Sequence, residues 1–89
     1  MEFRKESGRI FATDETGKPL AEVTFPEQEG VAVINHTFVD GSLRGQGVAG
    51  QLLRVVADTL RQDGRKAKVT CSYAVHWFET HPEERDLLG

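Results

Sequence analysis

The residues best suited to chemistry form a glycine-rich stretch, Arg44-Gly45-Gln46-Gly47-Val48-Ala49-Gly50, between a β-rich segment and an amphipathic helix. Glycines let a backbone come close to an anion, while the unpaired N–H groups and the positive dipole of a helix N-terminus attract negative charge. Arg44 adds a mobile positive charge to this stretch. The combination predicts a binding site for a pyrophosphate.

Two phosphate-binding patterns fit the same stretch. Gly45, Gly47 and Gly50 spell G-x-G-x-x-G, which is typical of a dinucleotide-binding turn, whereas Arg44, Gly47 and Ala49 spell R-x-x-G-x-A. A dinucleotide-binding unit needs an acidic residue at the end of its second strand and a second doubly wound half. The segment 66–70 leads into Cys71 instead, and 89 residues leave no room for two halves. We therefore prefer the second pattern.

Three other side chains could move protons near such a site. His36 lies in the strand that leads towards the glycines, and histidine exchanges a proton readily near neutral pH. Cys71 precedes a predicted helix N-terminus, which favours a thiolate, and Tyr73 is the only tyrosine. Each residue also has an ordinary structural interpretation, as a strand-edge histidine, a small buried cysteine and a packed tyrosine ring.

Composition limits the class of protein. A chain of 89 residues with 38% hydrophobic content is expected to form one domain, residues 1–89, with a thin core. The net charge of −3 argues against a nucleic-acid or membrane-surface partner, and the basic cluster of Arg61, Arg65, Lys66 and Lys68 is interpreted as a solvated helix end. A single cysteine without metal-ligand spacing predicts no internal disulfide and no metal. No segment has the apolar length of a signal peptide or membrane span, so we expect a cytoplasmic protein.

The pattern of apolar and turn residues predicts the elements that position these groups. Strands are expected at 8–13 and 20–25, joined by a turn, and a longer β-branched strand at 31–39. Apolar residues at helical spacing predict a helix over 47–63 that ends near Gly64, followed by a strand at 66–70 parallel to the 31–39 strand. Ser72 is the expected cap of a helix over 73–80, with Trp77 and Phe78 in the core and His81 at its end. The order predicts an α+β fold.

Three segments of this chain resemble the GNAT superfamily of acetyl-CoA-dependent N-acetyltransferases, in its minimal YjdJ-type branch. They are His36-Thr37-Phe38-Val39 with Leu43-Arg44-Gly45-Gln46-Gly47-Val48-Ala49, then Cys71-Ser72-Tyr73, and His81-Pro82 through Asp86-Leu87. With the strands before them, these segments cover essentially the whole chain. Two departures are visible, since Gly41 stands where proline is frequent and Ala49 where glycine is commoner.

The resemblance implies a mixed, mainly antiparallel sheet in which a parallel strand pair splays apart and helices pack on it. The pantetheine arm of acetyl-CoA would lie in that wedge, bonded by the backbone of Phe38 and Val39, one of which would also polarise the thioester carbonyl. Amides of Gln46, Gly47, Val48, Ala49 and Gly50 would hold the pyrophosphate, with Arg44 and Gly45 beside them and Ser72 and Tyr73 completing the coenzyme A site. His36, Cys71 and Tyr73 become the catalytic candidates, with Cys71 as proton donor or as nucleophile.

The resemblance therefore implies an N-acetyltransferase that moves an acetyl group from acetyl-CoA to an amine that the sequence does not identify. Larger members place helices between their first two strands, where this chain has only the turn at 14–19. The acceptor site is expected to be shallow, completed by a second subunit or fitted to a protein amine, in a monomer or weak homodimer. The alternatives are a coenzyme A-binding or protein-interaction module with little catalysis and a purely structural domain.

Overall fold

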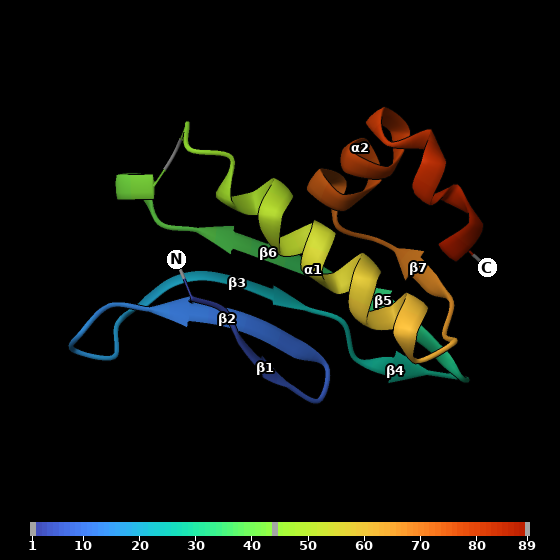
Figure 1. The fold of residues 1–89 in the computed structure, drawn as a ribbon, viewed down its shortest axis with the longest axis horizontal. Coiled ribbons are helices and arrows are strands. Elements are labelled where there is room, and N and C mark those ends of the chain that lie inside the picture. Colours follow the sequence, from blue (N-terminus) through green and yellow to red (C-terminus); the bar gives the residue numbers. More distant parts are fainter. Residues whose placement is uncertain (1, 44, 89) are drawn as a thin grey trace.

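The computed structural model describes residues 2–43 and 45–88, in which strands and helices share one core. Figure 1 shows the central helix crossing a twisted sheet, with the last helices beside one end of it. The elements, in chain order, are β1 Arg4–Glu6, β2 Arg9–Thr13, β3 Pro19–Thr24, β4 Glu27–Gln28, β5 Val31–Ile34, β6 His36–Val39, the 3₁₀ helix η1 Gly41–Leu43, α1 Val48–Gln62, β7 Ala67–Val69, α2 Ser72–Thr80 and the 3₁₀ helix η2 Pro82–Leu87.

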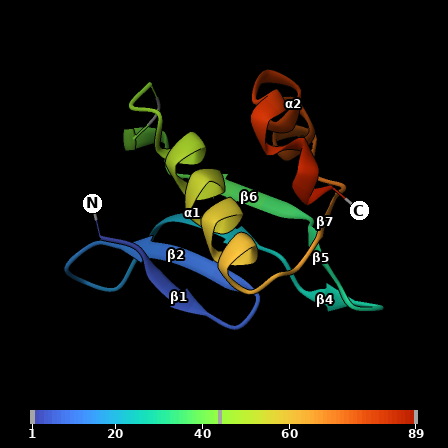
Figure 2. The ribbon, with the colours of Figure 1, turned by 45° about the vertical axis from the view of Figure 1, so that its right-hand side comes forward.

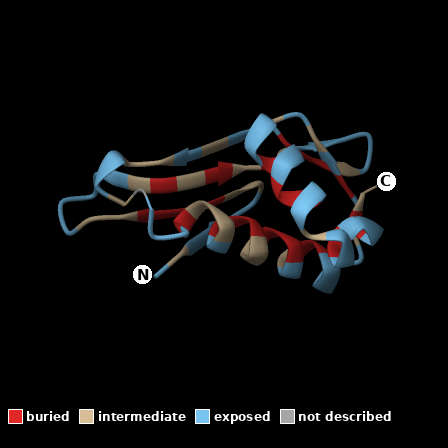
Figure 3. Ribbon diagram, turned by 90° about the horizontal axis from the view of Figure 1, so that it is seen from above, coloured by how far each residue is buried: buried red, intermediate tan, exposed pale blue. Residues whose placement is uncertain are grey.

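The predicted apolar stripe forms the buried side of α1. Leu52, Val56 and Leu60 are at most 1% exposed, and they lie against the sheet because residues three and four apart share one face of a helix. Figure 3 shows the buried residues of α1 on the side towards the sheet and the exposed ones on the outer side. Leu53 and Ala57 are buried as well, so the apolar face is wider than a single stripe of residues three and four apart.

Both ends of α1 depend on glycine in the left-handed region. Gly47 is the N-cap residue with a φ of 72°, and Gly64 follows the helix with a φ of 68°. The Gly64 N–H donates to the Arg61 carbonyl and the Arg65 N–H donates to the Leu60 carbonyl, which is the hydrogen-bond pair of a Schellman ending. The predicted end near Gly64 is confirmed, and the helix begins one residue after the predicted start.

The strand predicted at 31–39 is interrupted by a one-residue bulge. Thr24 pairs with His36, but Glu27 pairs with Ala32, so the residues around Asn35 contain one more residue than the opposite strand. The Asn35 N–H donates to the Thr24 carbonyl at this point. The prediction of one continuous strand is therefore wrong: β5 and β6 are separate strands that belong to different sheets.

The bulge also determines which strands remain together. β5 pairs in parallel with β7, from Ala32 opposite Ala67 to Ile34 opposite Val69, whereas β6 pairs antiparallel with β3. The predicted parallel neighbours are thus confirmed for the first half of the segment only. Figure 2 shows β6 and β7 on separate courses. β6 is the last strand of the sheet with the order β1-β2-β3-β6. The overall architecture is the predicted α+β arrangement of a mixed, mainly antiparallel sheet with a splayed parallel pair.

Two short strands were absent from the sequence prediction. β1 is an edge strand whose three residues are all exposed, and β4 contains only two residues, between the strands predicted at 20–25 and 31–39. Neither carries the alternating apolar residues from which a half-buried strand is recognised. None of the helices in the described part of the chain is long and apolar enough to cross a membrane.

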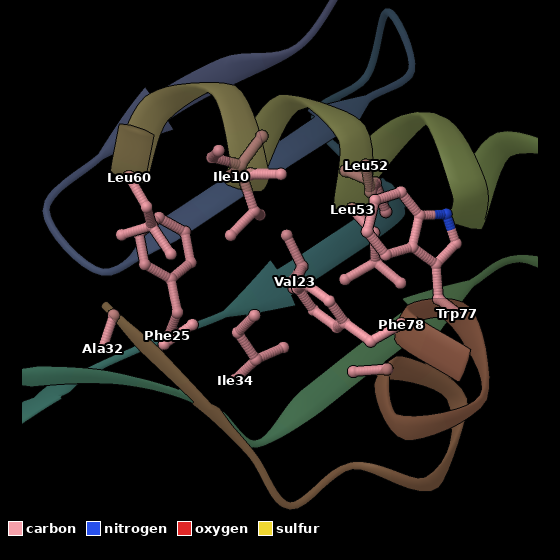
Figure 4. Packing of buried hydrophobic residues seen from close by; sticks show 14 of the residues in the cluster. Ile10, Val23, Phe25, Ala32, Ile34, Leu52, Leu53, Leu60, Trp77 and Phe78 are labelled. Carbon is pink, nitrogen blue, oxygen red and sulfur yellow. The ribbon is translucent and has the colours of Figure 1, made fainter. Parts of the chain in front are cut away.

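Helix α2 packs its aromatic residues against the first half of α1. Trp77 and Phe78 are 4% and 3% exposed, which confirms their predicted place in the core. Figure 4 shows them beside Leu52 and Leu53, with Val23 and Ile34 of the strands nearby. His81 ends the helix as predicted, with its ring stacked on Trp77 and its Nδ1 atom 2.7 Å from the Trp77 carbonyl oxygen.

The cap of α2 differs from the prediction. Cys71 occupies the N-cap position with extended backbone angles, and Ser72 is the first helical residue. The Cys71 carbonyl accepts from the Val75 N–H, as the N-cap carbonyl does when it starts a helix, but no side chain caps the helix. Ser72 is one position too late for the predicted role, because β7 ends and α2 begins one residue earlier than the sequence suggested.

A buried carboxylate connects α1 to η2. The Glu84 side chain is 8% exposed and accepts a hydrogen bond from Arg54 at 2.8 Å and from Arg61 at 2.9 Å. Arg61 also donates to Asp86, and the Lys66 ammonium donates to the Asp86 carbonyl. Arg61 and Lys66 of the basic cluster therefore hold the last segment, whereas the sequence suggested only a solvated helix end.

The two neighbouring glutamates of η2 provide a test of this connection. Glu84→Gln replaces a carboxylate shared by two guanidinium groups with a neutral amide, and we expect the free energy of unfolding to fall by about 1–3 kcal/mol. Glu83→Gln is the control, because the Glu83 side chain is 59% exposed and its ion pair with Arg54 is longer, at 3.7 Å. The change in the free energy of unfolding should stay within about 0.5 kcal/mol in this variant. Urea denaturation of both variants gives the comparison, and equal losses would contradict the assigned role of Glu84.

Candidate active site

The strand β6 and the helix α2 diverge, and a cavity of about 290 Å³ lies in the wedge between them. Thr37 and Val39 of β6 form one wall and Tyr73 of α2 contributes to the opposite one. These strand residues face the cavity because the extra residue at the bulge reverses the alternation: Ile34 points into the core, and Thr37 rather than His36 follows it on the same side. The cavity therefore lies on the side of the sheet that carries α1.

The beginning of α1 closes the end of the cavity. Gly45 and Gly47, with φ angles of 83° and 72°, line it together with Val48 and Ala49, and a Cβ atom added at either glycine would meet nothing within 4 Å. No described side chain caps the helix, so the N–H groups of its first turn point out of the helix without a side-chain acceptor. An anion at this end would meet backbone donors and the positive end of the helix dipole.

Arg44 and Gln46 are the two residues with polar side chains in the predicted phosphate loop. Arg44 lies outside the described residues. The Gln46 N–H already donates to the Leu43 carbonyl at 3.3 Å, and its side-chain amide lies 3.5 Å from the Ser42 carbonyl, so Gln46 supports the turn that precedes the helix. The backbone donors directed outwards at this end are therefore those of the first turn of α1.

The backbone of β6 has one free edge, and it faces the cavity side. The Asp40 N–H donates to the Leu20 carbonyl, and in an antiparallel pair such bonds recur at every second residue. Phe38 thus directs its backbone groups towards β3, whereas Thr37 and Val39 direct theirs away from it. A ligand that lies along the wedge as an extra strand would therefore meet the backbone of Thr37 and Val39.

Cys71 and Thr37 meet across the narrow end of the wedge, with Sγ 3.6 Å from the Thr37 hydroxyl oxygen. The Cys71 N–H donates to the Ile34 carbonyl, which fixes the thiol where β5 and β7 part. Partial burial raises the pKa of the Cys71 thiol, but hydrogen bonds from the Ala74 N–H, the Thr37 hydroxyl and the N–H groups of Tyr73 and Thr37 outweigh burial and bring this pKa below its usual value. The site thus favours a thiolate at the start of α2.

His36 and Phe38 lie on the other face of β6, away from α1. The His36 side chain is 56% exposed and its Nε2 atom is 3.9 Å from Glu22 Oε1, while Phe38 is 38% exposed. Arg9 lies over the ring of Phe11 and pairs with Glu22 on this face. No helix of the described chain covers this surface, which we call the open face. The structure therefore places His36 on the side opposite the cavity and separates it from the Thr37 side chain.

Tyr73 connects the cavity to a larger groove of about 660 Å³ between α1 and α2. Tyr73 is 42% exposed, and Gly47 also borders both spaces. Gln51, Arg54 and His76 provide polar groups along the groove, and Gly50 lies where a side chain would approach Trp77 Nε1. Ser72 is exposed at the first position of α2 and does not line either space.

Sequence reasoning missed Thr37 as a functional candidate. Regular alternation from Ile34 puts His36 on the inner side and Thr37 on the outer side, and only the bulge reverses this assignment. A threonine within a β-branched strand carries no distinguishing signal of its own. Its partner Cys71 is 34 positions away, so the contact could not be read from local spacing.

The arrangement suits transfer chemistry that needs a thiol or thiolate beside a narrow apolar channel with an anion site at its end. Within residues 2–43 and 45–88, no three His, Cys, Asp or Glu side chains converge to hold a metal ion. The groups that the structure brings together are the Cys71 thiol, the Thr37 hydroxyl, the exposed backbone edge of β6 and the first turn of α1.

The lowered pKa of Cys71 gives a direct expectation. Because Cys71 is the only cysteine, iodoacetamide alkylation followed by intact mass reports this thiol alone. We expect the midpoint of the rate against pH to lie lower in the native protein than in urea. The hydrogen bonds to the thiolate make their full contribution to the free energy of unfolding above the unfolded pKa, and this contribution is lost as pH falls through the folded pKa. A native midpoint at or above the urea value would contradict the assigned environment.

Comparison with known proteins agrees with this geometry. A sequence model of the GCN5-related N-acetyl-transferase family matches residues 9–87. The chain is similar to the solution structure of a GCN5-like protein from Staphylococcus aureus, with 30% identity over 99% of this chain and 87% of that one and a TM-score of 0.79. A ribosomal-protein-alanine N-acetyltransferase from Brucella melitensis biovar Abortus 2308 shares the fold, with 18% identity, coverage of 91% and 62%, and a TM-score of 0.57. The search of curated proteins returned no match. The chain belongs to the GCN5-related N-acetyltransferase family.

Proposed function

We propose that this protein binds acetyl-CoA in the wedge between β6 and α2 and transfers the acetyl group to an amine. The observation that carries the proposal is the proximity of three features: a cavity walled by Thr37, Val39 and Tyr73, an uncapped helix N-terminus at one end of it, and a cysteine with a lowered pKa in contact with the wall residue Thr37. An elongated ligand with an anionic middle and a reactive thioester tip matches this order of environments.

The residues along the wedge suit coenzyme A in three places: the glycines at the start of α1, the backbone edge of β6 and the groove between α1 and α2. The open space beside Gly45 and Gly47 allows phosphates to approach the backbone, which a Cβ atom would hinder. The backbone of Thr37 and Val39 offers hydrogen bonds of the kind that a pantetheine amide needs, because that edge of β6 faces away from β3. The groove beside Gln51, Arg54 and His76 is continuous with the phosphate end and offers space for the nucleotide.

Acetyl-CoA supplies a thioester whose carbonyl carbon is attacked by the acceptor amine. The Val39 N–H on the free edge of β6 is available to stabilise negative charge on the carbonyl oxygen. The Cys71 Sγ can hold a proton for the departing coenzyme A thiolate, or as a thiolate it can accept the acetyl group first. Tyr73, which lines the channel, is a second proton donor.

The acceptor is proposed to reach the site over the open face. His36 and Glu22 are located there, and His36 could take a proton from an amine approaching from that side. A surface without covering helices does not enclose a small molecule, so an amine displayed on a protein suits it better. A coenzyme A-binding module with little catalysis is the second candidate, favoured by the 56% exposure of the His36 side chain, which leaves a base there poorly oriented.

Two glycines that share a positive φ and open surroundings test cofactor binding. Acetyl-CoA should raise the melting temperature of the wild type, because a ligand that binds only the folded state stabilises it. Gly47→Val should abolish this rise, whereas Gly17→Val, at a φ of 89° in a distant hairpin with equal free space, should keep it. Both variants lose intrinsic stability from a branched residue at positive φ, so the ligand-dependent rise is the measurement.

The Gly47→Ala and Gly17→Ala pair repeats this comparison with less strain if the valine variants fail to fold. A ligand-dependent rise that survives in a folded Gly47 variant would remove the phosphate site from the start of α1.

Substitution of Cys71 separates binding from chemistry. Cys71→Ala should keep the acetyl-CoA-dependent rise in melting temperature and lower by about 10²–10⁴-fold the release of coenzyme A thiol with a lysine-containing peptide as acceptor. Partial activity in Cys71→Ser would favour a proton donor, because a hydroxyl can still donate. Acetylated Cys71, seen by intact mass before the peptide is added, would favour the covalent route.

Full activity in Cys71→Ala would exclude both roles of the thiol. Binding without measurable turnover in the wild type would favour the coenzyme A-binding module instead.

A further inference from the structure

One polar contact crosses the wedge between elements that otherwise diverge. Thr37 Oγ1 lies 3.6 Å from Cys71 Sγ, within the range in which sulfur takes part in a hydrogen bond, and the two residues are 34 positions apart. Thr37 is only partly buried and also lines the cavity, so its hydroxyl is not required to satisfy another group in the core. The extra residue at Asn35 is what turns this side chain inwards.

We propose that Thr37 is a positioning residue whose hydroxyl orients the Cys71 sulfur across the wedge and stabilises it as a thiolate. A threonine hydroxyl can rotate to accept from the thiol or to donate to the thiolate, so the same contact serves both protonation states. Donation to the thiolate is the stronger interaction, because hydrogen bonds to a charged partner exceed those to a neutral one. The proposal rests on the proposed function, since it assigns Thr37 a role through Cys71.

The contact is well placed for this role because the other donors around the sulfur are backbone groups. The N–H groups of Ala74, Tyr73 and Thr37 also lower the pKa of the Cys71 thiol, and their positions are set by the start of α2 and by β6. The Thr37 hydroxyl is thus the side-chain donor that substitution can remove without altering the backbone. The Thr37 methyl group is retained in valine, which has the same branching and the same preference for a strand.

The titratable and charged side chains on the neighbouring elements differ in where they lie. Tyr73 on α2 lines the same cavity, His36 on β6 points to the open face towards Glu22, and Lys68 on β7 is exposed. Any of these could influence a pH profile of Cys71. The pH dependence of Cys71 alkylation is therefore compared between Thr37 and its variants in a Tyr73→Phe background and in a His36→Asn background as well. The effect of Thr37 should persist in both.

The test measures the rate of iodoacetamide alkylation of Cys71 against pH in the absence of ligand. Thr37→Val should raise the midpoint by about one pH unit, the scale of a lost hydrogen bond to a charged group. Well below the midpoint, a tenfold smaller thiolate population is partly offset by higher nucleophilicity, so alkylation should slow by about threefold to fourfold. Thr37→Ser keeps the hydroxyl and should stay within about 0.3 units of the wild type.

Each other outcome overturns the proposal. An unchanged midpoint in Thr37→Val shows that the hydroxyl does not act on the sulfur, and an equal rise in Thr37→Ser shows that methyl packing is responsible. Thr37→Ala provides the same loss of the hydroxyl if the valine variant does not fold, and unfolding of both would assign Thr37 to the fold alone. The acetyl-CoA-dependent melting rise of the wild type is measured separately, so failure of the proposed function is distinguished from failure of this inference.

Discussion

The geometry of the site depends on one extra residue in the segment that contains β5 and β6. With regular pairing, Ala32, Ile34, His36 and Phe38 would share one face of the sheet. The bulge at Asn35 reverses the alternation, so that Thr37 and Val39 line the cavity and His36 and Phe38 lie on the open face. The same irregularity ends the pairing of this segment with β7, and the wedge opens there.

Much of the fold could be predicted because it follows local rules. The apolar spacing of α1, the glycine at its end and the aromatic residues of α2 indicated their elements and their burial directly. The bulge could not be predicted, since apolar and β-branched residues on both sides of Asn35 are consistent with one strand and an unpaired residue has no fixed composition. The position of Cys71 as the N-cap residue was missed for a related reason: the residues at which a strand ends and the next helix begins are set by packing.

The candidate site combines two kinds of constraint that act on different scales. The glycines at the start of α1 act through local backbone geometry, and for that reason the sequence alone indicated them. The contact between Thr37 and Cys71 acts through tertiary structure and appears only when β6 and α2 are placed together. The walls of the wedge thus come from different parts of the chain. The other face of β6, the open face, remains exposed to solvent.

The Glu84 connection has a consequence for how this small domain unfolds. Arg54 and Arg61 bind a carboxylate that lies 30 and 23 positions later in the chain, so the last segment is joined to the central helix by contacts of large sequence separation. Such a topology raises the contact order and disfavours partial opening of one end alone. Amide protons near the ends of α1 and in η2 should therefore exchange with solvent in one cooperative unit, although the chain is short enough for fraying to be the usual expectation.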